Sequence, residues 1–261
     1  MASASASQPL AGLAVVVTRS AGQASALTER LHALGATTVE VTTIAIEPPA
    51  DGGAALHAAL ADSARFECIA VSSPNGARAL LAACEATGHW PSVPLACVGP
   101  STAAVFENSP FTVEVVPDRS VAEGLVEAVG APETPGAQLL LVQAEVARPV
   151  LADGLSANGW SVQRVVAYRT VDGTVSPVDA QAAAQAHAIT FTSSSTVERF
   201  VRLAGRTALP PAIISIGPIT SETARSLDLT VDAEADPHTL DGLIDAVIAW
   251  ASTEVPPIEA P

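Results

Sequence analysis

The apolar positions of the chain fall into short continuous runs, separated by segments in which apolar residues recur at helical spacing. Runs rich in β-branched residues are typical of strands buried on both faces of a parallel sheet. In the segment after the first run, Leu27, Leu31 and Leu34 share one helical face, and Gly35 is placed to end that helix. The first half of the chain contains four such runs: LAVVVT (13–18), CIAVSS (68–73), PLACVG (94–99) and FTVEVVP (111–117).

Strands that alternate with helices predict a doubly wound α/β fold, with a parallel sheet covered by helices on both faces. Two helix starts can be placed from side-chain chemistry. Pro74 suits the first turn of a helix that follows the second run. Ser120 and Glu123 have the spacing of a capping box, which predicts the start of a helix over 121–129.

The whole alternation occurs twice along the chain. Residues 13–46 align without a gap on 137–170, so that Val15 matches Leu139 and Gly35 matches Gly159. Three later matches keep the same order: 66–81 with 186–201, Gly99-Pro100 with Gly217-Pro218, and 119–129 with 238–250. Chance similarity could produce one match but not an ordered series, so we interpret the chain as two similar α/β domains made by an internal duplication.

Composition narrows the possible functions. The net charge of the 261 residues is −15, which argues against nucleic-acid binding and against attraction to anionic membranes. All twelve basic residues are arginine, so a P-loop lysine and a Schiff-base lysine are both excluded. The histidines lack metal-site spacing, and Cys68, Cys84 and Cys97 form no CxxC pair. We therefore expect buried free thiols, no metal site and no disulfide framework.

Reduced cysteines suit the cytoplasm, and the first residues lack the basic and apolar regions of a secretory signal. No uninterrupted apolar run is long enough to span a membrane. We therefore expect a cytoplasmic protein with no membrane partner.

Hydroxyl-rich segments follow the predicted strands, at the edge of a parallel sheet where ligands bind. Each segment is predicted to open a helix, so free N–H groups converge there and can bind a large polyanion without lysine. The purely structural alternative is that these serines and threonines are ordinary helix N-caps. The segments are Thr18 to Ser20, Ser72-Ser73, Ser101-Thr102, Thr192 with Ser193, Ser194 and Ser195, and Thr220-Ser221.

Three larger polar side chains lie near the same predicted edge. Arg19 and Arg148 follow strands and could bind carboxylates through their planar guanidinium groups, or could be solvated surface residues. Tyr168 is the only tyrosine of the chain and lies in VVAYRTV (165–171). Its hydroxyl group could donate a hydrogen bond to a ligand, or its ring could serve packing alone.

In this order the motifs resemble the uroporphyrinogen-III synthase family, over about residues 13 to 250. The segments that carry the resemblance are VVVTR, AVSSPNGARAL, VGPSTAAV, VVAYRTV, ITFTSSSTVERF and SIGPITSETA. No single motif is specific, but their ordered and duplicated arrangement is.

The resemblance implies a monomer with two α/β domains joined by a two-stranded linker. One domain would be discontinuous and comprise 9–40 and 174–252, the other would comprise 48–163, and the linker strands would be 41–47 and 164–173. The implied reaction closes linear hydroxymethylbilane, a tetrapyrrole octacarboxylate, with loss of water and inversion of ring D. No cofactor is implied, and the only suggested protein partner is transient contact with hydroxymethylbilane synthase.

The resemblance also assigns roles to residues. Tyr168 and Thr220 match catalytic positions, with Tyr168 the better candidate for assisting water loss. The residues expected to bind substrate are Arg19, Ser72, Ser73, Thr102, Arg148, Ser193, Ser194 and Ser221.

Two departures from the family pattern stand out. Gln143-Ala144 replaces a frequent Arg-Gly pair, and the second serine turn lacks proline. Two other functions remain open: a non-catalytic clamshell or sensor that binds a tetrapyrrole or small anion, and a nucleotide-binding protein. The latter would lack both GxGxxG and a P-loop.

Overall fold

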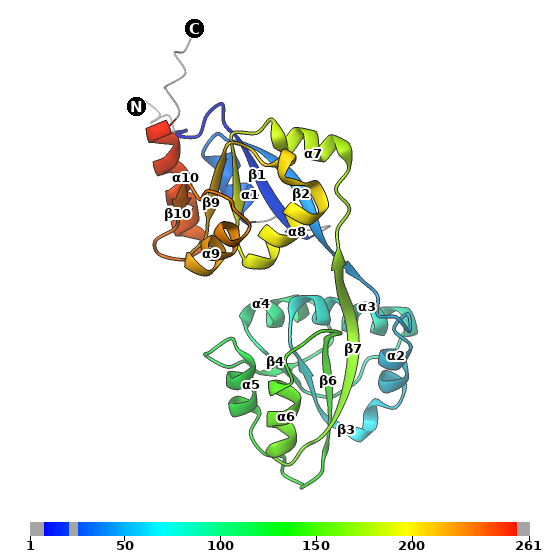
Figure 1. Ribbon diagram of the computed structural model, residues 1–261. Coiled ribbons are helices and arrows are strands. Elements are labelled where there is room, and N and C mark those ends of the chain that lie inside the picture. The colour runs from blue at the N-terminus through cyan, green and yellow to red at the C-terminus, as the bar shows by residue number, and fades with distance from the viewer. Residues whose placement is uncertain (1–7, 21–25, 255–261) are drawn as a thin grey trace, which may run out of the picture. The chain divides into compact units, whose positions relative to one another are not determined.

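The computed structural model describes residues 8–20 and 26–254, without the side chains of Arg19, Ser20 and Glu254. The chain divides into two compact units, with divisions after Ala45 and after Val171 (Figure 1). Unit 2 is the continuous segment 46–171, and unit 1 is built from the segments that precede and follow it. Both divisions fall inside the predicted linker segments 41–47 and 164–173.

Unit 2 contains a parallel sheet with the strand order β7-β6-β3-β4-β5. Its strands are β3 (Phe66–Val71), β4 (Leu95–Cys97), β5 (Val113–Val115), β6 (Gln138–Ala144) and β7 (Ser161–Asp172). Its helices are α2 (Ala54–Ala61), α3 (Pro74–Thr87), α4 (Pro100–Ala103), α5 (Ala122–Val129) and α6 (Val150–Ala157), with 3-10 turns at Ser63–Arg65 and Ala104–Phe106.

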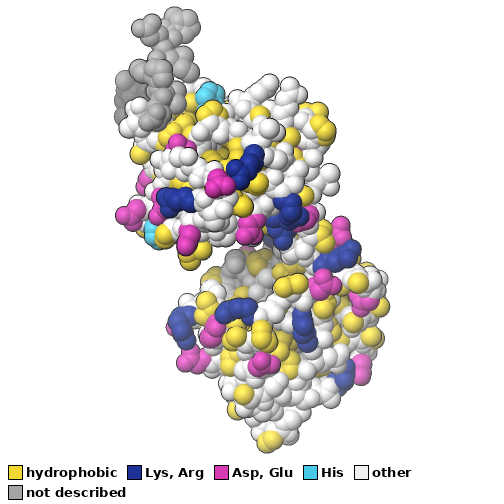
Figure 2. All heavy atoms as spheres, in the orientation of Figure 1, with side chains coloured by type: hydrophobic (Ala, Val, Ile, Leu, Met, Phe, Trp, Pro, Cys, Tyr) yellow, Lys and Arg dark blue, Asp and Glu magenta, His cyan; other side chains and the backbone are white. Residues whose placement is uncertain are grey.

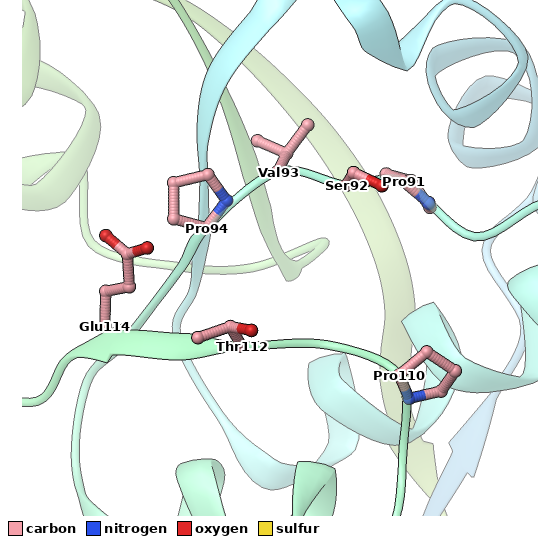
Figure 3. A pocket seen from close by; sticks show the side chains of 7 residues that line it. All are labelled: Pro91, Ser92, Val93, Pro94, Pro110, Thr112 and Glu114. Atoms are coloured by element: carbon pink, nitrogen blue, oxygen red, sulfur yellow. The ribbon is translucent and has the colours of Figure 1, made fainter.

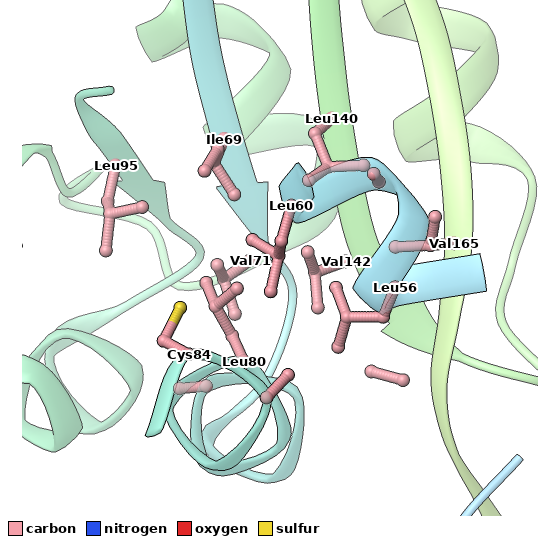
Figure 4. Packing of buried hydrophobic residues seen from close by; sticks show 14 of the residues in the cluster. Leu56, Leu60, Ile69, Val71, Leu80, Cys84, Leu95, Leu140, Val142 and Val165 are labelled. Atoms are coloured by element: carbon pink, nitrogen blue, oxygen red, sulfur yellow. The ribbon is translucent and has the colours of Figure 1, made fainter. Parts of the chain in front are cut away.

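Both faces of this sheet are buried, as the continuous apolar runs predicted. On one face, Leu80 and Cys84 of α3 lie beside Val71 of β3 and Val142 of β6, and Leu60 of α2 lies in the same cluster (Figure 4). On the other face, a second cluster joins Leu125 of α5 and Leu155 of α6 to Leu139 and Leu141 of β6. Unit 2 is therefore doubly wound.

Unit 1 repeats this plan with the strand order β2-β1-β8-β9-β10. Its strands are β1 (Ala14–Ser20), β2 (Thr37–Glu47), β8 (Ala188–Phe191), β9 (Ala212–Ser215) and β10 (Ala233–Glu234). Its helices are α1 (Ala26–Ala33), α7 (Pro177–Ala184), α8 (Ser194–Ala204), α9 (Pro218–Ser226) and α10 (Leu240–Glu254), with a 3-10 turn at Arg206–Ala208. One core cluster includes α1 and α10, and the other includes α7, α8 and α9.

The two sheets also share their strand register. Val15 pairs with Ala188 where β1 meets β8, and Leu139 pairs with Cys68 where β6 meets β3. These pairs join residues that are aligned in the sequence repeat. The register shift between Arg19 and Ser20 in β1 likewise recurs between Gln143 and Ala144 in β6. Each sheet therefore combines the opening strands of one half of the chain with the later strands of the other half.

Two local predictions are wrong. The capping box of Ser120 and Glu123 does not form, because α5 begins at Ala122 and its N-cap residue, Val121, makes no side-chain cap. Instead, the Ser120 side chain lies against Gly99, where a Cβ atom would be 2.5 Å from the Ser120 Oγ. Residues Thr18 to Ser20 do not open a helix either, since β1 runs through Ser20.

The Gly-Pro junctions have a packing role in both units. His238 lies over Gly217 as Ser120 lies over Gly99, and a Cβ atom at Gly217 would be 3.0 Å from the His238 Cγ. At a second pair of glycines, the close neighbour is a backbone carbonyl group instead of a side chain. A Cβ atom would be 2.3 Å from the Arg119 carbonyl oxygen at Gly124, and 1.9 Å from the Pro237 carbonyl oxygen at Gly242. Glycine is thus needed at these positions because the chain passes too close for a side chain.

The three cysteines are free and buried, which confirms the prediction from their spacing. Burial raises the pKa of Cys68 to about 12, of Cys84 to about 11 and of Cys97 to about 12. Glu114 adds to the shift at Cys68. Among the described residues, no helix has the length and apolar character needed to cross a membrane.

We predict that Gly124→Ala destabilises the protein although alanine is the better helix former. The gain in helix propensity is about 1 kcal/mol, whereas overpacking against a backbone carbonyl costs roughly 1–3 kcal/mol. Gly76→Ala is the matched control, since its Cβ atom would meet neighbours at an ordinary 3.5 Å. In urea unfolding, the midpoint concentration should be lowered by Gly124→Ala only. Equal midpoints for the two variants would contradict the close approach at Gly124.

We also predict that the free energy of unfolding decreases above pH 9. Thiols of the unfolded chain ionise near their ordinary pKa of 9.0, whereas the buried thiols hold their protons up to about pH 11. The unfolded state therefore binds fewer protons in this range, and each thiol contributes a slope of about −1.4 kcal/mol per pH unit. The absence of lysine leaves few other groups titrating there. Urea unfolding from pH 8 to 10.5 measures the slope, and Cys84→Ala should lessen it; a flat profile would refute the expectation.

Candidate active site

The carboxyl end of β3 leads directly into the N-terminus of α3. Ser73 is the N-cap residue, and its Oγ accepts a hydrogen bond of 3.1 Å from the Gly76 backbone N–H. Pro74 is the first helical residue, as predicted. Ser72 donates from its Oγ to the Val142 carbonyl oxygen over 3.4 Å, which ties the turn to the neighbouring strand β6. The serine pair therefore fixes a strand end, a helix start and the adjacent strand together.

Tyr168 reaches this turn because of the register shift between β6 and β7. Val165 and Ala167 of β7 are buried in the core cluster on the α2 and α3 side of the sheet. Regular alternation would turn the next side chain to the opposite face. After the shift, Tyr168 pairs with Ala144 and packs against the same cluster as Val165 and Ala167. Strand irregularities of this kind re-aim side chains beside functional sites.

The Tyr168 hydroxyl group lies 3.0 Å from the Ser73 Oγ, and either oxygen can donate the hydrogen bond. The backbone at this point is also held, because the Tyr168 carbonyl oxygen accepts a 2.9 Å bond from the Glu145 N–H. The side chain is half-buried. Among the predicted site residues of unit 2, the structure thus brings Ser73 and Tyr168 together and places Ser72 beside them.

Thr102 and Arg148 lie elsewhere in unit 2. Thr102 is completely buried in α4, and its Oγ1 has no hydrogen-bond partner among the described residues. Arg148 lies before α6 and forms two bonds, of 3.1 and 3.4 Å, to the two carboxylate oxygens of Glu123. The backbone N–H of Glu123 and the Arg148 guanidinium lower the pKa of the Glu123 carboxyl group. Arg148 therefore binds a carboxylate as its geometry suggested, but one from its own chain.

In unit 1, the serines after β8 connect two helices. The Ser193 Oγ lies 3.1 Å from the Ser195 Oγ. Ser194 donates to the Ile219 carbonyl oxygen over 3.2 Å and accepts from the Thr223 Oγ1 over 2.8 Å. Ser194 thereby links the start of α8 to α9. Arg19 is the penultimate residue of β1, and its side chain lies outside the described residues.

Thr220 and Ser221 lie in the first turn of α9, and both are buried. The Ser221 Oγ is 2.5 Å from the Ser215 Oγ and donates to the Glu234 carboxylate. Its hydroxyl group is therefore occupied by contacts that join β9, α9 and β10. Neither Ser215 nor Glu234 was expected at the site. Glu234 lies in a two-residue strand, which is too short for any periodic signal.

Most of the described arginine side chains form ion pairs with carboxylates of the chain itself. Figure 2 shows arginine and acidic side chains next to one another on the visible face of each unit. Arg164 donates instead to the carbonyl oxygens of Ala144 and Glu145, over 3.1 and 2.6 Å. Ion pairs inside the units join Arg30 to Asp241, Arg65 to Asp62, Arg119 to Glu127, Arg169 to Glu47, Arg202 to Asp172 and Arg206 to Asp228.

One cavity of unit 2 lies at the opposite end of the sheet. It measures about 230 Å³ and is formed where the chain enters β4 and β5, whereas the Ser73 turn follows the carboxyl end of β3. Figure 3 shows its lining of Pro91, Ser92, Val93, Pro94, Pro110, Thr112 and Glu114. The part of the chain that the structure describes contains no group of three or more His, Cys, Asp or Glu side chains that could hold a metal ion.

Comparison with known proteins agrees with this fold. The family model described as "Uroporphyrinogen-III synthase HemD" matches residues 25–245. A uroporphyrinogen-III synthase of Synechococcus elongatus is 36% identical, over 94% of this chain and 98% of that protein. The Helicobacter pylori uroporphyrinogen-III synthetase structure has a TM-score of 0.58 at 16% identity, over 91% of this chain and 99% of that one. A mutant Thermus thermophilus uroporphyrinogen III synthase has a TM-score of 0.55 at 18% identity, over 93% and 100%.

We predict that Ser221→Ala lowers the free energy of unfolding by roughly 1–3 kcal/mol, because it removes the buried hydrogen bond to Ser215 and the charge-assisted hydrogen bond to the Glu234 carboxylate. The position itself accepts alanine, since Ala103 is its counterpart in unit 2. Ser226→Ala, at an exposed position of the same helix, is the control and should change stability by less than about 0.5 kcal/mol. Thermal and urea unfolding measure both variants. Equal stabilities would show that the Ser221 contacts are not structural.

Proposed function

We infer the chemistry of the site from one premise: the chain belongs to the uroporphyrinogen-III synthase family. Its activity is accordingly that of a uroporphyrinogen-III synthase, a hydro-lyase of tetrapyrrole biosynthesis. The substrate is the linear tetrapyrrole hydroxymethylbilane, which the enzyme closes with loss of water and inversion of ring D.

The reaction needs a proton donor and control of conformation. Loss of the terminal hydroxyl group, as water, leaves an azafulvene cation that the pyrrole nitrogen stabilises. A donor that hydrogen-bonds the departing oxygen lowers this barrier. Ring D then attacks at its substituted carbon to form a spiro intermediate, which fragments and closes again in the inverted orientation. Because the free substrate can close unaided to the uninverted isomer, the enzyme must hold the chain so that the substituted carbon attacks.

Tyr168 is the donor that we assign to water loss. The observation that carries this assignment is the 3.0 Å contact between its hydroxyl group and Ser73 at the carboxyl end of the unit 2 sheet. In the proposed step the phenol proton passes to the leaving hydroxyl group, and water departs. The phenolate takes back the proton that the closed ring system releases. The donor is thus restored, and no external reagent is consumed.

Backbone N–H groups are the proposed anchors for the carboxylates. The N-termini of α3, α8 and α9 follow strands β3, β8 and β9 directly. Each offers about 0.3–1 kcal/mol to an anion when exposed, so a ligand with many carboxylates must use several. The internal pairing of the arginines supports this assignment. We place Ser72, Ser193, Ser194 and Thr220 at these termini, with Arg19, Thr102 and Arg148 as further candidates, and Ser73 beside Tyr168.

We further propose that the two units are similar domains made by duplication, with 9–40 and 174–252 in one, 48–163 in the other, and linker strands at 41–47 and 164–173. The equal registers of β1 with β8 and of β6 with β3 support this proposal. The enzyme would work as a monomer without a cofactor, with hydroxymethylbilane synthase as a transient partner at most.

An isomer assay tests the function. Freshly prepared hydroxymethylbilane is supplied, the products are oxidised, and uroporphyrins I and III are separated by chromatography. We expect type III to dominate. Type I alone, formed at the uncatalysed rate, would mean that the chain only binds a tetrapyrrole or a small anion on the same fold.

Tyr168→Phe tests the donor in the same assay. Loss of the hydroxyl group should lower kcat by about 10²-fold, the usual contribution of a general acid. Ser176→Ala, which removes an N-cap from α7 in unit 1, is the control for handling and stability. If Tyr168→Phe forms type III product at the wild-type rate, Tyr168 is not the acid.

A further inference from the structure

We propose that Ser73 is a positioning residue for the reaction, which sets the direction of the Tyr168 hydroxyl group so that its proton points to the substrate. The proposal rests on the assignment of Tyr168 as the proton donor. It differs from the expectation that Ser73 binds a substrate carboxylate directly.

The hydrogen bonds of Ser73 define its role. Its Oγ already accepts the Gly76 N–H at 3.1 Å, and Tyr168 lies 3.0 Å away. A hydroxyl group has one proton to donate. When Ser73 donates that proton to the Tyr168 oxygen, the tyrosine proton is left free for the departing hydroxyl group. If Tyr168 instead donated its proton to Ser73, the tyrosine oxygen could only accept a hydrogen bond from the substrate.

The same arrangement stabilises the charge that forms in the reaction. Ser73 caps α3, a helix of 14 residues whose N-terminus has a partial positive charge. A phenolate at Tyr168 would accept a hydrogen bond from the Ser73 hydroxyl group. The Gly76 N–H, which donates to the Ser73 Oγ, would polarise that hydroxyl group. Hydrogen bonds in such a chain strengthen one another. The helix start thus acts on Tyr168 through one side chain.

The other copy of the motif supports a specialised role. Ser193 is the counterpart of Ser73 and also precedes a helix. The counterpart of Tyr168 is Ile44, which follows the equivalent register shift and has no hydroxyl group. Ser193 contacts Ser195 instead. A serine therefore occupies this position in both copies, but only the copy in unit 2 places a tyrosine hydroxyl against it.

Three variants at Ser73 separate capping from positioning. Aspartate is a good N-cap but has no proton to donate when ionised, whereas threonine keeps both properties. We expect Ser73→Asp to unfold like the wild type yet to lose kcat by about tenfold, the worth of one hydrogen bond. Ser73→Ala should lose both kcat and stability. Ser73→Thr should retain both, and Ser176→Ala should lose stability but not kcat.

A double-mutant cycle identifies the path of the effect. If Ser73 acts through Tyr168, Ser73→Ala should lower kcat about tenfold in the wild-type background and leave it unchanged in the Tyr168→Phe background. Its KM should change little. An equal loss of kcat in both backgrounds, or a loss confined to KM, would overturn the proposal in favour of direct substrate binding.

The two assignments fail in different ways. Wild-type turnover by Tyr168→Phe would remove the donor and with it the premise of this inference. A slow Tyr168→Phe together with wild-type kcat in Ser73→Ala and Ser73→Asp would retain the donor and refute only the positioning role.

Discussion

The pairing of β1 with β8, and of β6 with β3, is the constraint on which the rest of the structure depends. Neither sheet can be built from one half of the chain, because its central pair joins an opening strand of one half to a later strand of the other. The registers agree because both central pairs bury the same kind of apolar face. This pairing forces the chain to pass between the units twice, near residues 45 and 171, and it brings β7, with Tyr168, to the strands of unit 2.

The two units share a strand order and register but hold different side chains at equivalent positions. In unit 2, the shift in β7 turns Tyr168 toward Ser73, and the position of Ser221 is taken by Ala103. In unit 1, Ile44 replaces the tyrosine, and the buried Ser215 and Ser221 hydroxyl groups contact each other while Ser221 also donates to the exposed Glu234 carboxylate. Unit 2 therefore places a tyrosine hydroxyl group against Ser73, whereas in unit 1 the hydroxyl groups of Ser215 and Ser221 join strands and a helix.

Local signals in the sequence predicted the apolar strands and the helix start after Ser73, because each depends on neighbours a few residues away, and the repeat followed from aligning the two halves of the chain. They could not predict the contact between Ser73 and Tyr168, whose partners are 95 positions apart and meet only after a register shift. The capping box predicted at Ser120 failed for the same reason, since the Ser120 side chain packs on Gly99 and does not cap its own helix. Arg148 was expected to bind a carboxylate of the substrate, and the sequence could not show that Glu123, 25 positions away, is its partner in the folded unit.

The insertion of unit 2 within unit 1 has a consequence for synthesis on the ribosome. Chains emerge from their N-terminus, so β1, α1 and β2 are made first, and β1 can pair with β2, but the other edge of β1 has no partner until β8 appears. Unit 2 is continuous and can complete its sheet in the meantime. One edge of the apolar β1 therefore stays unpaired while more than a hundred further residues are translated. Chaperones cover surfaces of this kind. A chain that ends soon after residue 172 would still contain all the strands of unit 2, yet its N-terminal segment would lack β8, β9 and β10, which complete the sheet of unit 1.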